Sequence, residues 1–279
     1  MIKIIDALKR SIFNIYNDIT LEIAGYVAYM AFLALFPFFI LLMMLAGYIG
    51  TTHVATTALS EIYKILPQEV VKEISPIVSE VTQHSPQGGY IIIVILTILW
   101  ISSSGVEAVR MGLNHVYKLK ENRSFVFRRS QSLIFVLVGS ISFFMGIGIL
   151  IIIPFLLELW HMIEVHLPNF PQLPAYFFET TFNVIRVLIA YSAVLIWFTT
   201  SYKWLPNHQV DLVKCIPGAT IASILWILAV GLFSVYIRSF ARYNIYYGSL
   251  GGVIVTLLFF QISASIFLFG GQINKELEK

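Results

Sequence analysis

The stretch GYVAYMAFLALFPFFILLMMLAGYIG, from Gly25 to Gly50, decides the fold of this chain. Its 26 residues include no Asp, Glu, Lys, Arg or His. Because an α-helix rises about 1.5 Å per residue, a helix of this length exceeds the ~30 Å hydrocarbon core of a bilayer. The sequence therefore predicts a membrane-spanning helix here.

The rest of the chain has the same character. Hydrophobic residues make up 58% of the sequence and charged residues only 12%, with a mean hydropathy of +0.83. Backbone polar groups must pair internally in lipid, so the long apolar stretches are predicted to be helices. The fold class expected is all-α, a single integral membrane domain over residues 1–279 with six transmembrane helices. The predicted spans are Gly25 to Gly50, Gly89 to Val106, Leu133 to Leu157, Tyr176 to Tyr202, Cys215 to Ile237 and Tyr247 to Gly270.

The distribution of Lys and Arg predicts the orientation of the chain. Of 18 such residues, 13 lie in the two tails and in the loops after the second and fourth spans. The positive-inside rule therefore places both termini in the cytoplasm. The same asymmetry accounts for the net charge of +3, so we expect the lipid bilayer and no nucleic acid as a partner.

The first extracytoplasmic loop, Thr51 to Gly88, has apolar residues at helical spacing, interrupted by Pro67 and Pro76. This pattern predicts short amphipathic helices. They could cap the bundle or offer a surface to a partner protein.

A cluster of Glu158, His161, Glu164 and His166 has side chains that bind zinc, but their spacing matches no hydrolase motif. The neighbouring Trp160 and prolines favour a membrane-interface turn instead. We predict no metal, no cofactor and no catalytic residue, and we expect that the protein is not an enzyme.

Polar residues inside the predicted spans are the candidate functional residues. Glu179, Asn183 and Arg186 fall on one face of the fourth predicted span, which should point into the bundle. A charge at mid-depth costs at least ~2.5 kcal/mol, so such a residue usually pairs or lines a polar path. Two interpretations of Arg186 stay open: it lines a substrate pathway, or it snorkels to the outer headgroups beside Glu179.

A second group lies near the outer ends of the last two spans. Its Arg and Tyr side chains suit a phosphate or carboxylate head group. The hypothetical substrate pathway as a whole comprises Glu179, Asn183, Arg186, Arg238, Arg242, Tyr246, Tyr247 and Gln261. Helix packing or kinking is predicted at Pro37, Gly248, Gly251 and Gly252.

Short phrases along nearly the whole chain carry a resemblance to a known family. They are Leu33 to Pro37, Leu99-Trp100, Ser102 to Val106, Asn114, Tyr117, Leu205-Pro206-Asn207, Pro217-Gly218-Ala219, Trp226, Phe233-Ser234, Tyr236, Tyr243-Asn244, Tyr247 to Gly252 and Gly270 to Asn274. In this order they resemble the YihY/virulence factor BrkB family of bacterial inner-membrane proteins, formerly labelled ribonuclease BN. The chain departs from the family pattern at Gln272, where an acidic residue is usual, so no proton could be carried there.

The resemblance implies a six-span, multi-pass protein of the bacterial cytoplasmic (inner) membrane that acts in the cell envelope. Two functions remain open. One is a transporter or lipid translocase for an anionic lipid or another anionic small molecule. The other is a non-transporting envelope scaffold or assembly factor. Ribonuclease activity is disfavoured, and homo-oligomer formation is left open.

Overall fold

The computed structural model describes residues 6, 9–11, 13, 19–49, 89–166, 175–208, 210–240 and 244–278. The described part is helical and contains no strand. Its six long helices are α2 (Thr20–Ile49), α5 (Gly89–Val116), α6 (Phe125–His166), α7 (Ala175–Trp204), α8 (Leu212–Phe240) and α9 (Asn244–Glu278). Each of them contains one predicted span or nearly all of it, so the all-α prediction is confirmed for these residues.

Several helices run beyond the predicted spans at the end that carries the basic loops. α5 continues past Val106 to Val116, and α6 begins at Phe125, before the predicted start at Leu133. Charged residues at these ends therefore lie on helices instead of in a loop. Helices α8 and α9 contain segments, Leu212–Ile237 and Gly251–Glu278, that are long and apolar enough to cross a membrane, each with an 18-residue stretch of mean hydropathy 2.2.

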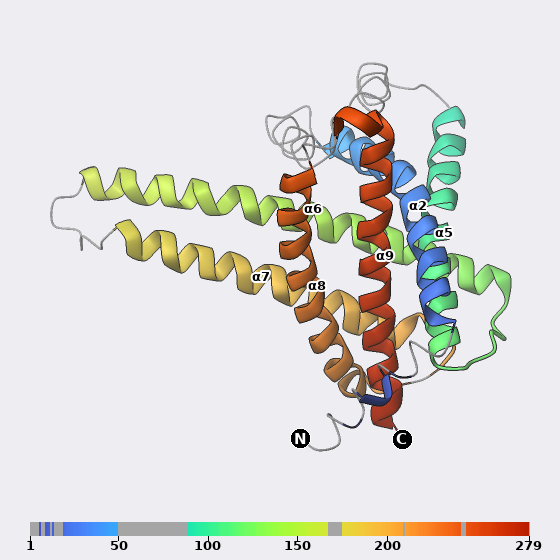
Figure 1. Ribbon diagram of the computed structural model, residues 1–279. Coiled ribbons are helices and arrows are strands. Elements are labelled where there is room, and N and C mark those ends of the chain that lie inside the picture. The colour runs from blue at the N-terminus through green and yellow to red at the C-terminus, as the bar shows by residue number, and fades with distance from the viewer. Residues whose placement is uncertain are drawn as a thin grey trace.

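Four helices, α2, α5, α8 and α9, run alongside one another, with α9 between α2 and α8 (Figure 1). The first residues of α2 and the last residues of α9 lie at the same end of this group. Helices α6 and α7 cross the group obliquely in this view and extend beyond it on the same side. Contacts along this pair join α6 to α5 and α7 to α8.

The described helices expose many large apolar side chains, and they bury small and polar residues alongside an apolar core. Large apolar side chains are exposed on the outside, with Val213 and Leu232 each at 73%. Small and polar residues are buried between the helices, among them Ala24, Ser103 and Asn274. Small residues let helix backbones approach closely, and buried polar groups pair across helices, which is the packing mode of helices in lipid.

Two glycines of α5 show this close approach. A Cβ at Gly105 would lie 3.0 Å from the Ala34 Cβ of α2, and one at Gly112 would lie 3.0 Å from Leu268 of α9. α5 is thus held tightly against α2 and α9, which fixes the position of the polar residues that follow on its last turns.

Some predicted features lie outside the described residues. They are the amphipathic helices between Thr51 and Gly88, the proline turn over 167–174, and Arg242. The side chains of Glu158, His161, Glu164 and His166 also lie outside the described part, so the zinc question stays open there.

Candidate functional site

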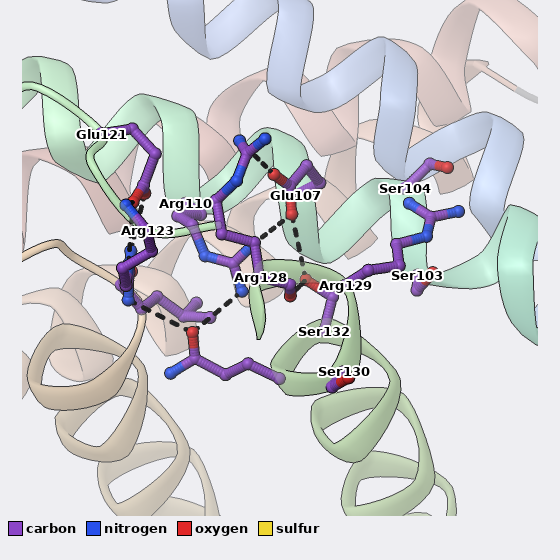
Figure 2. A network of polar contacts seen from close by, with 12 residues as sticks. Ser103, Ser104, Glu107, Arg110, Glu121, Arg123, Arg128, Arg129, Ser130 and Ser132 are labelled. Carbon is purple, nitrogen blue, oxygen red and sulfur yellow. Dashed lines mark hydrogen bonds and ion pairs between the residues drawn. The ribbon is translucent and has the colours of Figure 1, made fainter. Parts of the chain in front are cut away.

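The last turns of α5 and the first turns of α6 form a cluster of charged side chains (Figure 2). We call it the Glu107 cluster: Glu107 and Arg110 of α5, with Arg128, Arg129 and Ser132 of α6. The Glu107 carboxylate accepts hydrogen bonds from the guanidinium of Arg110, from Nη1 of Arg128 at 2.9 Å and from the Ser132 hydroxyl at 3.1 Å. One carboxylate thereby joins two helices.

Arg129 extends the cluster toward the middle of α5. Its guanidinium lies over the Trp100 ring, 3.9 Å from the centroid, and donates a hydrogen bond to the Trp100 carbonyl oxygen. Trp100 lies inside the predicted second span, and Arg129 is only 9% exposed. The charged cluster therefore reaches the depth of a predicted membrane segment, where an ionisable residue points to function by default.

A second set of contacts, the Glu121 clamp, fixes the loop between α5 and α6. Arg123 donates to both carboxylate oxygens of Glu121, at 2.8 and 2.7 Å, and to the Leu205 carbonyl oxygen at 2.8 Å. Asn114 donates to Glu121 at 2.8 Å and accepts from the backbone N–H of Asn207 at 2.7 Å. The clamp ties this loop to the loop that follows α7.

The charge on Glu121 is stabilised by its partners. The hydrogen bond from Arg123 lowers the pKa of the Glu121 carboxyl to about 2, and the Asn114 amide acts in the same direction. Glu121 is therefore ionised throughout the physiological range and balances Arg123. The Glu107 cluster is different, because its three guanidinium groups outnumber its single carboxylate and leave a net charge of +2.

A pocket of about 350 Å³ opens beside both sets of contacts. It lies between α2, α5 and α6, and its volume falls near the lower end of the range for small-molecule sites, about 300–1,000 Å³. The lining residues are Tyr26, Glu107, Arg110, Met111, Asn114, His115, Leu119, Glu121 and Arg128. Charged groups of both signs and an exposed apolar rim meet here, so the pocket can bind an ionic group that carries an apolar part.

Two of the phrases that carry the family resemblance, Pro217-Gly218-Ala219 and Gly270 to Asn274, meet at the same end of the molecule. Asn274 of α9 accepts from the backbone N–H of Gly218 at 2.7 Å and donates to the Cys215 carbonyl oxygen at 3.1 Å. Tyr202 of α7 donates to the Phe267 carbonyl oxygen at 2.6 Å. These contacts bind α7, α8 and α9 together, and they leave the pocket on the opposite side of α5.

Gln272, the departure from the family pattern, is 4% exposed and donates to Glu276 at 3.4 Å. Glu276 in turn lies 4.0 Å from Arg10. An acidic side chain is therefore present one turn after Gln272 on the same helix.

The pathway residues predicted from the sequence are only partly placed. Gln261 donates to the Leu21 carbonyl oxygen at 3.2 Å, so it joins α9 to α2 and does not line the pocket. The other predicted residues with a described backbone lie on α7, α8 or α9, and their side chains are outside the described part: Glu179, Asn183, Arg186, Arg238, Tyr246 and Tyr247.

Of the predicted packing residues, Pro37 lies within α2, Gly251 is buried, and the surroundings of Gly248 are not described. A Cβ at Gly252 would meet no described atom within 4 Å. The roles assigned to these four residues stay predictions.

The sequence did not single out Glu107 or assign a site to Arg128 and Arg129. Glu107 lies one residue past the predicted end of a span, where a carboxylate is expected in water, and the arginines contributed only to the orientation argument. The spacing of Glu107 and Arg110, three residues apart on a continuing helix, was the available signal.

Comparison with known proteins places the chain among bacterial membrane proteins. A family model described as virulence factor BrkB matches residues 14–279. The ribonuclease-like protein YfkH of Bacillus subtilis is 31% identical over 252 residues, which cover 90% of this chain and 88% of YfkH.

A UPF0761 membrane protein of Pseudoalteromonas translucida is 22% identical over 257 residues, covering 90% of this chain and 79% of the relative. Another, from Actinobacillus pleuropneumoniae, is 37% identical over 86 residues, 30% of this chain and 31% of the relative. No solved structure matches. The resemblance found in the sequence is thus confirmed: with the family model covering nearly the whole chain, this helical membrane protein belongs to the virulence factor BrkB family.

Proposed function

We propose that the chain is a six-span protein of the cytoplasmic membrane, with both termini in the cytoplasm, that moves an anionic amphiphile across the bilayer. The Glu107 cluster carries this proposal. Arg110, Arg128 and Glu107 line a pocket, and Arg129 beside them reaches a carbonyl oxygen inside a predicted span. Ionisable groups at the depth of a membrane span are costly, and they usually pair with one another or line a polar pathway.

The orientation that we propose puts the pocket at the cytoplasmic side of the bilayer. The region from Arg110 to Arg129 holds six basic residues, more than any other region between two predicted spans. The beginning of α2 and the end of α9 lie at the same end of the bundle as the α5–α6 loop (Figure 1). Anionic lipid at the cytoplasmic leaflet attracts such segments, by about 1 kcal/mol per Lys or Arg. An anionic head group would thus reach the pocket from the inner leaflet.

The outer half of the route is proposed from the sequence alone. Arg186 and Arg238 are its leading residues, because their guanidinium groups can hold a head group by two parallel hydrogen bonds. Removal of both guanidinium groups should therefore stop translocation. Activity that persists in the double variant Arg186→Leu with Arg238→Leu would contradict the roles given to them.

The test of the proposed function is lipid translocation in vesicles. Purified protein is placed in phosphatidylcholine vesicles with a trace of fluorescent phosphatidic acid or fluorescent phosphatidylcholine. Access of a membrane-impermeant quencher then reports movement between leaflets. We expect faster movement of phosphatidic acid with the protein than in empty vesicles, and a loss of this difference in Arg128→Gln. Equal rates with and without protein would defeat the proposal.

An envelope scaffold is the alternative function. Its sequence basis was the amphipathic first loop together with the basic second loop. The first loop lies outside the described residues. Part of the second loop is engaged internally, since Arg123 contacts Glu121 and Leu205. Exposed residues such as Lys120 remain available to a partner. Crosslinking from a single cysteine at position 120 would distinguish the two functions. A scaffold should give the same crosslinked protein neighbour in repeated preparations, and the absence of such a neighbour would count against it.

We also propose that the protein does not hydrolyse RNA, although YfkH is named ribonuclease-like. A general base must be free to accept a proton near neutral pH. In the pocket, Glu107 accepts from two guanidinium groups and a hydroxyl, and Arg123 lowers the pKa of Glu121 to about 2. Cleavage of labelled RNA by pure protein that disappears in Glu107→Gln would contradict this proposal.

A further inference from the structure

The charge and exposure of the Glu107 cluster allow the head group to be named. Arg110 and Arg128 line the pocket beside Glu107, and Arg129 lies outside the lining, against Trp100, so the cluster carries a net charge of +2. The other carboxylate in the lining, Glu121, is balanced by Arg123. A phosphate monoester, which approaches two negative charges near neutral pH, can balance the excess on the cluster. A carboxylate brings only one. We propose that the pocket binds the terminal phosphate of a lipid phosphomonoester, with Arg128 as its direct ligand and Glu107 as an internal competitor. This inference rests on the proposed function and specifies its substrate class.

Arg128 is the guanidinium that a ligand can reach. Its side chain is 28% exposed and lines the pocket, whereas Arg110 is 1% exposed and is held by Glu107 and by Gln131 at 3.1 Å. The Nε atoms of both arginines are buried, and no described residue accepts a hydrogen bond from either. Unsatisfied donors of this kind are costly, and a phosphate oxygen that reached Nε of Arg128 would satisfy one of them.

Glu107 occupies the place that a phosphate oxygen would take. Its carboxylate oxygen lies 2.9 Å from Nη1 of Arg128, a normal distance for a charge-assisted hydrogen bond. A bound phosphate must therefore displace the carboxylate from Arg128 or share the guanidinium with it. Arg110 and Ser132 also hold Glu107, so the carboxylate keeps partners when Arg128 turns to the ligand.

The surface beside the pocket favours a lipid as the source of the phosphate. Tyr26 of α2 lines the pocket, and Tyr29 and Leu33 follow it on the same face of the helix. These side chains are 40%, 52% and 42% exposed. They form an apolar stripe that leads from the charged pocket along α2, where the acyl chains of a lipid can lie while its head group is in the pocket.

The inference is tested by binding in detergent, which requires no transport. The probes are dihexanoyl phosphatidic acid, dihexanoyl phosphatidylcholine and inorganic phosphate, each titrated against purified protein and followed by native mass spectrometry. We expect wild type to retain phosphatidic acid in preference to phosphatidylcholine. Equally tight retention of inorganic phosphate would support the phosphate site with a free anion as its source, whereas retention of the lipid alone would support the lipid source.

The variants test the two roles in opposite directions. Arg128→Gln should abolish retention of phosphatidic acid, and Arg128→Lys should restore part of it, because a charge returns without the planar fork. Glu107→Gln should strengthen retention by about tenfold, because the competing charge is gone. Glu107→Gln also protects the test from misfolding, because a gain of binding requires a folded protein.

Matched controls are available in the exposed pair Asp211 and Lys214, whose side chains are 81% and 62% exposed. Asp211→Asn and Lys214→Gln change the net charge by the same amounts as the test variants, and retention should stay at the wild-type level. Weaker binding in Glu107→Gln, or wild-type binding in Arg128→Gln, would overturn the inference.

The two proposals can fail separately. Phosphate binding that depends on Arg128, without movement of lipid in vesicles, would defeat the translocase and leave the phosphate site intact. Lipid movement that does not change in Arg128→Gln would defeat the phosphate site as the entry point and leave translocation intact.

Discussion

Arg129 at the beginning of α6 lies over the ring of Trp100 in the middle of α5, with its Cζ atom 3.9 Å from the ring centroid. The same guanidinium donates a hydrogen bond to the Trp100 carbonyl oxygen, which also accepts from the Ser103 hydroxyl at 2.8 Å. A cation thus stabilises a crowded carbonyl within a predicted membrane span. It fixes where α6 crosses α5.

We expect Arg129→Met to lower the stability of the protein. The change leaves the stem length similar but removes a cation–π contact and a charged hydrogen bond, together about 1–3 kcal/mol. The melting temperature in mild detergent should fall by several degrees. Lys214→Gln, which removes an exposed charge, should leave it unchanged. An Arg129→Met protein with the melting temperature of wild type would show that the contact between Arg129 and Trp100 does not anchor α6.

The crossing of α8 and α9 depends on two glycines. A Cβ at Gly218 would collide with the Gly270 carbonyl oxygen and the Asn274 side chain, and a Cβ at Gly270 would lie 2.7 Å from the Ala222 Cβ. Backbone cannot move aside cheaply, so Gly218→Ala should cost at least about 1–3 kcal/mol.

The control for this prediction is Gly231→Ala in the same helix, where a Cβ would meet no described atom within 4 Å. Both variants add one methyl group to α8. We expect monodisperse protein from Gly231→Ala by size-exclusion chromatography, and aggregated or poorly expressed protein from Gly218→Ala. Equal behaviour of the two would mean that the helices do not approach as described.

Asn274 should tolerate little change, because its side-chain oxygen accepts one hydrogen bond and its side-chain nitrogen donates another. It is fully buried, and it bonds the backbone of α8 at Gly218 and Cys215. Asn274→Leu would remove both hydrogen bonds between α9 and α8, each worth about 0.5–1.5 kcal/mol. The melting temperature should fall further than in Asn207→Leu, whose partly exposed side chain bonds only the Lys120 carbonyl oxygen. A smaller fall in Asn274→Leu would contradict the assignment.

The Glu121 clamp predicts a dependence of stability on acid pH. Arg123 lowers the pKa of Glu121 from its ordinary value of 4.5 to about 2 in the folded protein. The folded protein therefore binds this proton less readily than the unfolded chain does. The resulting stabilisation is fully present above about pH 4.5 and is lost as the pH falls toward 2.

The measurement is the difference in melting temperature between wild type and Glu121→Gln at several pH values. This difference should be constant from pH 7 to about 5 and should shrink below the ordinary pKa of 4.5. Other carboxylates that titrate in the same range affect both proteins equally, so they cancel in the difference between the two melting temperatures. A difference that stays constant down to pH 3 would show that Glu121 is not held in its charged form.

Membrane orientation can be tested with the single cysteine of the chain. Cys215 is buried, so Cys215→Ala gives a background on which one new cysteine reports its side of the membrane. A cysteine at Lys120 should react with an impermeant reagent only when the inner face is open, and one at His53 only when the outer face is exposed. Labelling of both from the same side would contradict the six-span arrangement.

The sequence alone determined the helices and the family. Long apolar stretches such as Gly25 to Gly50 can pair their backbone groups in lipid only as helices, so length and composition were sufficient there. The ordered phrases from Leu33 to Asn274 were likewise sufficient for the family, which the match over residues 14–279 confirms.

The charged site was decided by the tertiary structure. Glu107 and Arg128 are separated in sequence by a loop, and the hydrogen bond between them exists because α6 crosses α5 beside Trp100 and not at its end. Hydropathy depends only on the residues within one segment of the chain. From the sequence, Arg128 and Arg129 were therefore expected in a basic loop. Which charges meet across two helices depends on how the helices cross, and this follows from side-chain packing between them, such as Gly105 against Ala34, which no single segment encodes.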